Sequence, residues 1–237
     1  MKVYSDWDIS HNDNGELLEK EFDINFQINA IHDTFFNVWY SNRQRPGNRF
    51  DDTSLAIDGN TQLFSENEYG LYAEVKPMSG LYLSTRFAWG DAIDFVNNRL
   101  GYKKEFRPVI NWNVNKHLEI KLRHTFKSLY ADSEDVFAAR LTDLRATYQF
   151  DVLSFLRLSV IYNNTSRNPF NAPLVDPDDI TSEYQDLSMQ LLYAYKINPQ
   201  TVFYLGYSEH SDDAEVMGQR EKDLRSVFMK FSYAWLK

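Results

Sequence analysis

The residues best suited to acid–base or nucleophilic chemistry are the five histidines, His11, His32, His117, His124 and His210. Only His210 lies close to several acids, in the stretch SEHSDDAE over residues 208–215. A lipase or protease site needs such a His beside a Ser or paired acids. A hydrated acidic loop is the commoner meaning of such a run. We therefore predict no catalytic residues and rank a hydrolase third among the possible functions.

Three further acidic stretches could bind divalent cations through carboxylate oxygens. They are HNDNGE (11–16), ADSEDV (131–136) and VDPDDI (175–180). None has the full spacing of a calcium-binding loop, and solvation is the simpler interpretation. The sequence has no phosphate loop, nucleotide fingerprint or zinc spacing, and it contains no cysteine for thiolate ligands or disulfides. We predict neither a metal nor another cofactor.

A larger set of charges follows one pattern, seen first in YGLYAEVKPMSGLYLSTRFAW (69–89). Apolar residues occupy every second position, and Glu74, Lys76 and Arg86 lie between them. A period of two predicts strands with two different faces, here joined by a tight turn. The same pattern recurs along the chain and predicts one charged face, which carries Glu74, Lys76, Arg86, Arg107, Glu119, Lys121, Arg123, Asp143, Arg145 and Arg157.

The elements that must position these charges are about 12 antiparallel strands in a single all-β domain over residues 1–237. Short connections are expected near 29–32, 76–80, 114–117, 150–153 and 197–200. Long polar connections are expected at about 43–67, 91–104, 131–138, 164–184 and 210–222. Because the two kinds alternate, each kind should lie at one end of the sheet. An even strand number lets the last strand pair with the first and close an up-and-down barrel.

Two environments suit a two-faced sheet: the apolar face packs inward in a soluble barrel or sandwich, or it meets lipid in a membrane barrel. The repeated stretches of 9–14 residues favour membrane strands, which need about 9–11. Aromatic residues also cluster at both strand ends, as in the two girdles of membrane barrels. The predicted girdles comprise Tyr40, Tyr69, Trp89, Trp112, Tyr148, Tyr162, Tyr193, Tyr195, Tyr207, Tyr233 and Trp235. His124 falls on the apolar face, where we expect it near an interface.

Composition narrows the partners. The net charge of −9 argues against nucleic acid, and no run of 18 apolar residues predicts a membrane helix. The first residues, MKVYSDWDIS, lack the pattern of an export signal. If the protein is exported, we expect this chain to be a mature form or a fragment.

The end of the chain, SVFMKFSYAWLK, resembles the signal by which the bacterial barrel-assembly machinery recognises outer-membrane barrels, although Leu236 and Lys237 follow Trp235. Four stretches are similar to the C-terminal barrel of an outer-membrane family of unknown function whose N-terminal domain resembles carbohydrate-binding module family 9. They are NRFDDTSLAIDG (48–59), FRPVINWNVNKHLEIKLRHTF (106–126), NPQTVFYLGYSE (198–209) and RSVFMKFSYAWL (225–236). The resemblance implies a Gram-negative outer membrane, contact with its lipid and lipopolysaccharide, an upstream carbohydrate-binding module, and a barrel that extends upstream of this chain.

These observations predict a channel or transport barrel in which small polar solutes pass the charged face. The alternative is a membrane anchor or scaffold for the carbohydrate-binding module, without transport.

Overall fold

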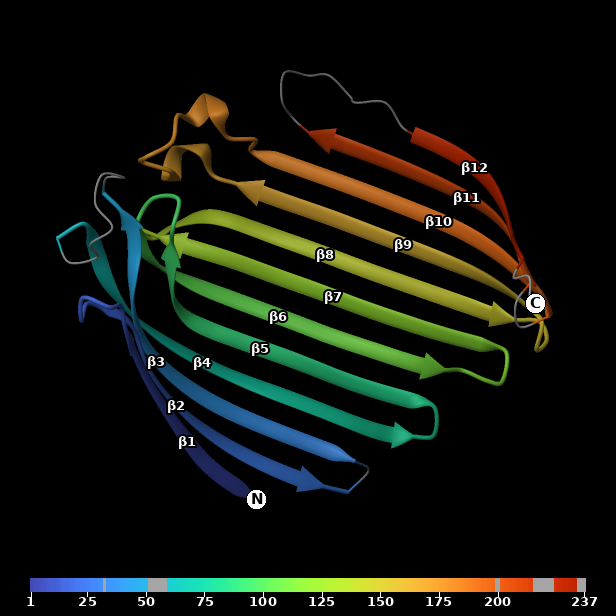
Figure 1. Cartoon of the computed structure of the whole chain (residues 1–237), viewed down its shortest axis with the longest axis horizontal. Helices are drawn as coiled ribbons and strands as arrows, with labels where there is room; N and C mark the ends of the chain where they lie inside the picture. The colour runs from blue at the N-terminus through green and yellow to red at the C-terminus, as the bar shows by residue number, and fades with distance from the viewer. Residues whose placement is uncertain (32, 51–58, 199–200, 215–223, 234–237) are drawn as a thin grey trace.

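The protein is one antiparallel sheet of twelve strands arranged in sequence order, which confirms the predicted all-β, up-and-down class (Figure 1). The computed structural model describes all residues except 32, 51–58, 199–200, 215–223 and 234–237. Two 3-10 turns, Pro169–Asn171 and Pro177–Asp179, interrupt the connection between the ninth and tenth strands. Within the described residues, no helix is both long enough and apolar enough to cross a membrane.

The strands are mostly 14–18 residues long, and only the first and last have 10. Their bounds are β1 Lys2–His11, β2 Leu17–Ala30, β3 Thr34–Arg49, β4 Thr61–Met78, β5 Leu81–Asp94, β6 Arg99–Asn113, β7 Leu118–Ala131, β8 Glu134–Gln149, β9 Ser154–Arg167, β10 Glu183–Asn198, β11 Thr201–Ala214 and β12 Leu224–Tyr233.

The register turns the alternating sequence into two distinct faces. Between β4 and β5, Leu71 lies opposite Phe87, while Tyr72 lies opposite Arg86. Because neighbouring residues of a strand point to opposite sides, the first pair belongs to an apolar face and the second to a polar face. These names are kept for the two faces of the whole sheet.

The apolar face has no second layer of described residues packed on it. Side chains from its middle keep large exposed fractions, such as Val38 (40%), Phe106 (41%) and Leu205 (44%). Isolated exposed apolar residues are ordinary on soluble proteins, but a continuous face of them marks a surface that another apolar phase covers.

The two edges of the sheet remain apart among the described residues. β1 pairs with β2, and β12 pairs with β11, but no described pair joins β1 to β12. Figure 1 shows these strands at opposite edges of an open, curved sheet. Closure of a barrel therefore stays a prediction.

The connections that the sequence predicts to be long are shorter than expected, because the strands extend into them. β3 and β4 continue to Arg49 and from Thr61, β5 and β6 are joined by residues 95–98 alone, and β7 and β8 by 132–133. The expectation that 91–104 and 131–138 are long loops is wrong, and loop 164–184 shortens to 168–182. The strands continue because charged residues keep the period of two and pair across strands, although the apolar signal has ended. The connections alternate between the two ends of the sheet. The end with the β3–β4, β5–β6, β7–β8 and β9–β10 connections is called the long-loop end, and the end with the β4–β5, β6–β7 and β8–β9 connections is called the short-turn end.

Candidate functional site

The ten predicted polar-face charges do share one face of the sheet. Arg86 lies opposite Arg107 between β5 and β6, and Arg123 lies opposite Asp143 between β7 and β8. The remaining members follow at intervals of two along the strands or in register across them: Glu74, Lys76, Glu119, Lys121, Arg145 and Arg157. Register therefore places all ten residues on the polar face.

Arg86 is the predicted residue with the most contacts. Its guanidinium nitrogens lie 3.1 Å from Glu68 and 3.3 Å from Glu105, and its Cζ lies 4.7 Å from the centre of the Trp39 ring. Arg107 reaches Glu105 at 2.9 Å. Two arginines directly opposite each other would repel, and Glu105, whose side chain is only 9% exposed, compensates both.

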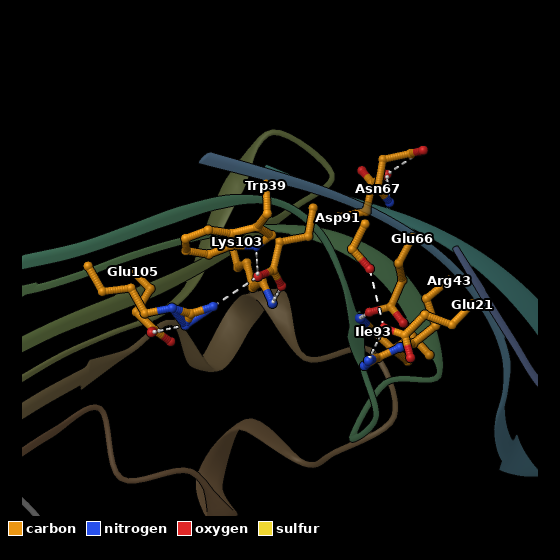
Figure 2. Close-up of polar contacts among 12 residues, drawn as sticks. Glu21, Trp39, Arg43, Glu66, Asn67, Asp91, Ile93, Lys103 and Glu105 are labelled. Atoms are coloured by element: carbon orange, nitrogen blue, oxygen red, sulfur yellow. Dashed lines mark hydrogen bonds and ion pairs between the residues drawn. The ribbon is translucent and has the colours of Figure 1, made fainter. Parts of the chain in front are cut away.

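Glu68 connects this pair to β3 and β6. Its carboxylate accepts hydrogen bonds from Trp39 Nε1 at 3.3 Å and from Lys103 Nζ, in addition to Arg86. Figure 2 shows Trp39, Lys103 and Glu105 gathered on one side of the strands. One carboxylate therefore binds two cations and an indole from three different strands.

A second group of ion pairs lies beside it, toward β2. Arg43 Nε is 3.0 Å from Glu19 and its Nη2 also reaches Glu21, while Arg45 binds Glu66 through two nitrogens at 2.6 and 3.2 Å. Glu66 also accepts the backbone N–H of Ile93 at 3.1 Å (Figure 2). We call the residues of both groups the ion-pair cluster: Glu19, Glu21, Trp39, Arg43, Arg45, Glu66, Glu68, Arg86, Lys103, Glu105 and Arg107.

Sequence reasoning missed most of this cluster because Arg43, Arg45, Glu66 and Lys103 fell inside expected loops. The signal was nevertheless present, since charges at 43 and 45, at 66 and 68, and at 103, 105 and 107 keep a period of two. Charge alternation continues a strand as well as apolar alternation does when opposite charges meet across strands.

The other predicted charges have fewer partners. Glu74 accepts hydrogen bonds from Tyr72 at 2.6 Å and Tyr82 at 2.8 Å, and Lys76 pairs with Asp33 at the short-turn end. Lys121 contacts Glu119 of its own strand at 3.0 Å.

Arg123, Asp143 and Arg145 line a hollow of about 190 Å³, and no ion pair joins β7 to β8 among the described residues. Arg157 donates to Thr147 Oγ1 at 3.4 Å. The hollow lined by Arg123, Asp143 and Arg145 therefore holds charged side chains that no ion pair joins between β7 and β8 among the described residues.

The predicted aromatic residues form rows on the apolar face. In the middle of β3 and β4, the Tyr40 and Tyr69 ring centres are 5.1 Å apart, and Tyr69 stacks on Trp89 of β5 at 6.1 Å. This row was expected at the strand ends, but the strands continue past it toward the long-loop end. Near the short-turn end, Tyr148 stacks on His117 at 5.9 Å. The register places the other girdle residues on the same face: Trp112, Tyr162, Tyr193, Tyr195, Tyr207 and Tyr233. Trp235 lies outside the described residues.

Two histidines of the acidic stretches belong to strands. His11 ends β1 and His210 lies within β11, so neither is part of a loop. His124, on the apolar face, contacts Thr142 Oγ1 through Nδ1 at 2.9 Å, which satisfies one ring nitrogen within the sheet. His32 falls outside the described residues.

His210 meets a serine and an acid that the sequence does not place near it. Ser188 Oγ lies 2.8 Å and Asp186 Oδ1 lies 3.2 Å from the same atom, His210 Nδ1. A catalytic triad uses one ring nitrogen for the acid and the other for the hydroxyl. Here both of these contacts reach the same ring nitrogen, Nδ1.

A cap covers part of the polar face at the long-loop end. It consists of the connections 95–98, 132–133 and 168–182, and this name is kept below. Figure 1 shows the ends of β3 and β5 turning toward the 168–182 segment. The turn of β5 starts at Gly90, whose φ of +138° is one that L side chains rarely adopt; beyond it the pairing with β4 ends.

Side chains join the cap across long sequence distances. Arg99 donates to Asn171 O at 2.7 Å and pairs with Asp94 and Asp132 at 3.1 and 2.6 Å. Asn171 Nδ2 contacts the carbonyls of Ala131, Glu134 and Asp135 at 3.0–3.2 Å. Arg99 and Asn171 therefore join the cap connections to one another and to the ends of β7 and β8.

No metal site emerges from the part of the chain that the structure describes, since no three His, Asp or Glu side chains there lie close enough together to hold an ion. The sequence matches no known protein family and none of the curated proteins. The resemblance to an outer-membrane family therefore stays a prediction.

Proposed function

We propose that this chain forms an outer-membrane barrel wall whose polar face lines a path for small polar solutes. The apolar face then contacts lipid, the aromatic rows lie at the two interfaces, and the cap lies at the mouth. The likeness of the last strand to an assembly signal adds the barrel-assembly machinery as a partner.

One observation carries this proposal: over the whole sheet, apolar side chains of one face remain uncovered while charged side chains gather on the opposite face. A soluble protein would place the uncovered side in water, at a cost of about 25 cal/mol for each Å² of apolar surface. Lipid on that side and water on the other satisfy both faces at once.

The test of the barrel is electrophoretic mobility with and without boiling, after folding in detergent. A closed barrel keeps its compact shape until it is boiled, so two bands are expected. A single band that boiling does not move would contradict closure by this chain alone.

The test of transport is current through planar bilayers, with Arg123→Glu as the variant and Lys116→Glu in the short turn 114–117 as the control. Both exchange one positive for one negative charge, but only Arg123 belongs to the polar face. We expect Arg123→Glu to shift the reversal potential toward cation preference and Lys116→Glu to shift it much less. A folded protein that carries no current would contradict transport.

A second function, an anchor without transport, is favoured by the cap and the ion-pair cluster, because both occupy the polar side. In that case bilayers stay silent, and glycan binding by a longer chain with the carbohydrate-binding module is lost when that module is deleted. Unchanged glycan binding after the deletion would contradict the anchor.

A further inference from the structure

The cap and the strand ends beneath it form a half-open apolar cavity on a face that is otherwise charged. Its volume is about 460 Å³, within the range of small-molecule sites of about 300–1,000 Å³. The floor is formed where Leu129 lies opposite Phe137, and Phe137 lies opposite Arg167. These three residues continue the polar-face positions of β7, β8 and β9. The charged pattern therefore becomes apolar at one place, directly below the cap.

The roof comes from two of the cap connections. Phe95 and Val96 belong to the β5–β6 turn, and Ala172, Val175 and Ile180 belong to the 168–182 segment. A cavity walled mostly by aliphatic and aromatic side chains prefers a hydrocarbon or aromatic group over water.

The cavity is held open by groups that are themselves buried. Asn97, 6% exposed, accepts the Leu174 N–H at 3.3 Å and donates to Asp94 at 2.8 Å. Asp94, 4% exposed, also binds Arg99. Because these hydrogen bonds join the two roof connections to each other and to the ends of β5 and β6 without any ligand, a ligand would not need to order the roof.

The cavity lining includes one cation, Arg167. The polar groups Asp94, Asn97 and Asn168 already bind partners in the cap, whereas the guanidinium of Arg167 has no hydrogen-bond or ion-pair partner among the described residues. A guanidinium binds carboxylates through two parallel hydrogen bonds. Asp179, an exposed acid of the lining, disfavours anions near its own side of the cavity.

We propose that this cavity is a binding site for a small carboxylate with an apolar body, such as a medium-chain acid or an aryl-alkanoate. The apolar body lies between Leu129, Phe137 and the cap, and the carboxylate binds Arg167. The site does not depend on the transport function, because it is complete within the described chain.

The probe is octanoate, measured by calorimetry with the full 237-residue chain in phosphatidylcholine nanodiscs, and empty nanodiscs supply the blank. Saturable binding of octanoate is expected, with weaker binding of octanol and weaker still of octyltrimethylammonium. Absence of saturable octanoate binding overturns the proposal, and preference for the ammonium compound overturns the choice of a carboxylate.

Arg167→Gln tests the head group. It should weaken octanoate about fivefold, the effect of an exposed charge pair, and leave octanol unchanged. Arg145→Gln is the matched control, the same exchange on the same face but toward the short-turn end and outside the cavity lining, and it should change neither. Equal losses in both variants would overturn the assignment of Arg167. Asp179→Asn should leave octanoate binding unchanged or tighten it, and a loss would overturn the proposed orientation.

Ala172→Leu tests the cavity by filling it, and it should weaken octanoate and octanol alike by about tenfold, as a core position resists added volume. Val96→Asp is the second variant. Val96 lines the cavity but is 65% exposed, so this position should accept a substitution even if Ala172→Leu does not fold. It should also weaken both ligands, and unchanged binding would overturn the cavity as the site. A protein that binds octanoate but carries no current would contradict transport and leave this site standing.

Discussion

The polar face has two regions with similar composition and different order. From β2 to β6, each arginine of the ion-pair cluster meets an acid of a neighbouring strand or of its own strand. From β7 to β9, Lys121 lies opposite Arg145, and Arg123 lies opposite Asp143 without an ion pair. A charge in a strand can therefore stabilise the sheet or remain available to a solute, and its sequence context alone does not distinguish the two roles.

The difference lies in the ion pairs formed and not in the register, because both regions place an acid two residues before a cation that faces another cation. In the first region Glu105 lies two residues before Arg107 on the same strand, and it reaches both opposed arginines. In the second region the acid opposite Arg123 stands beside Arg145, and like charges face each other one step away. We infer that the first region resists deformation and that the second gives the polar face its ion preference.

The largest expected effect comes from the glycine beneath the Trp39 ring. A Cβ at Gly70 would lie 2.0 Å from Trp39 Cζ2, so Gly70→Ala must displace the ring that stacks on Arg86. We expect a loss of about 2–3 kcal/mol in the free energy of unfolding, measured by urea titration in phosphatidylcholine vesicles.

Gly206→Ala provides the matched comparison, because its Cβ would lie 2.2 Å from the Phe228 ring. Phe228 belongs to β12, which pairs with one described strand only, so the ring can move away. A loss of about 1 kcal/mol is expected. Equal losses for the two glycines would show that the ion-pair cluster adds no rigidity.

The next prediction compares a carboxylate that binds cations of two other strands with one that pairs with a cation of its own strand. Glu68→Gln removes the charge that faces Arg86 and Lys103, and we expect it to lower the free energy of unfolding by about 1–3 kcal/mol. Glu119→Gln removes a carboxylate that pairs, within the part of the chain the structure describes, with Lys121 of its own strand alone and is 38% exposed; less than about 0.5 kcal/mol is expected. The same urea titration decides, and a larger loss at Glu119 would reverse the assignment of the two regions.

The smallest effect lies in the short turn between β8 and β9. Asp151 accepts the backbone N–H groups of Leu153 and Ser154, each at 2.8 Å, and the Ser154 hydroxyl at 3.0 Å. The Leu153 hydrogen bond leads the contacts that hold the pKa of Asp151 below its ordinary value of 3.8.

A lowered pKa means that the carboxylate stabilises the folded state above pH 3.8 and that this contribution is lost as the pH falls through the folded value. Asp151→Ala should therefore lower the urea midpoint slightly at pH 7, and the two midpoints should converge at a pH well below 3.8. A difference that persists unchanged in acid would show that the turn does not depend on the charge of Asp151.

Much of this architecture could be predicted from residue types alone. The alternation around Leu71 and Phe87 predicts two faces, and the tight turn near Gly80 fixes an antiparallel pair. Arg123 and Asp143 were expected on the same face, and the register confirms it. A two-residue period needs only local sequence, because every second side chain must share a face.

Residues whose roles depend on distant partners escaped prediction. Glu66 and Lys103 were assigned to loops, since nothing in their own stretches shows that Arg45 and Glu68 lie beside them. Ser188 and Asp186 reach His210 only through the pairing of β10 with β11.

The sequence by itself determined the all-β class, the antiparallel order and the sorting of charged and apolar side chains, because these follow from spacing along one strand. The tertiary structure decided which charges pair, where the strands end, and that a cap forms a half-open apolar cavity above Leu129 and Phe137. Those features depend on register and on contacts between residues such as Arg99 and Asn171, 72 positions apart, which local periodicity does not encode.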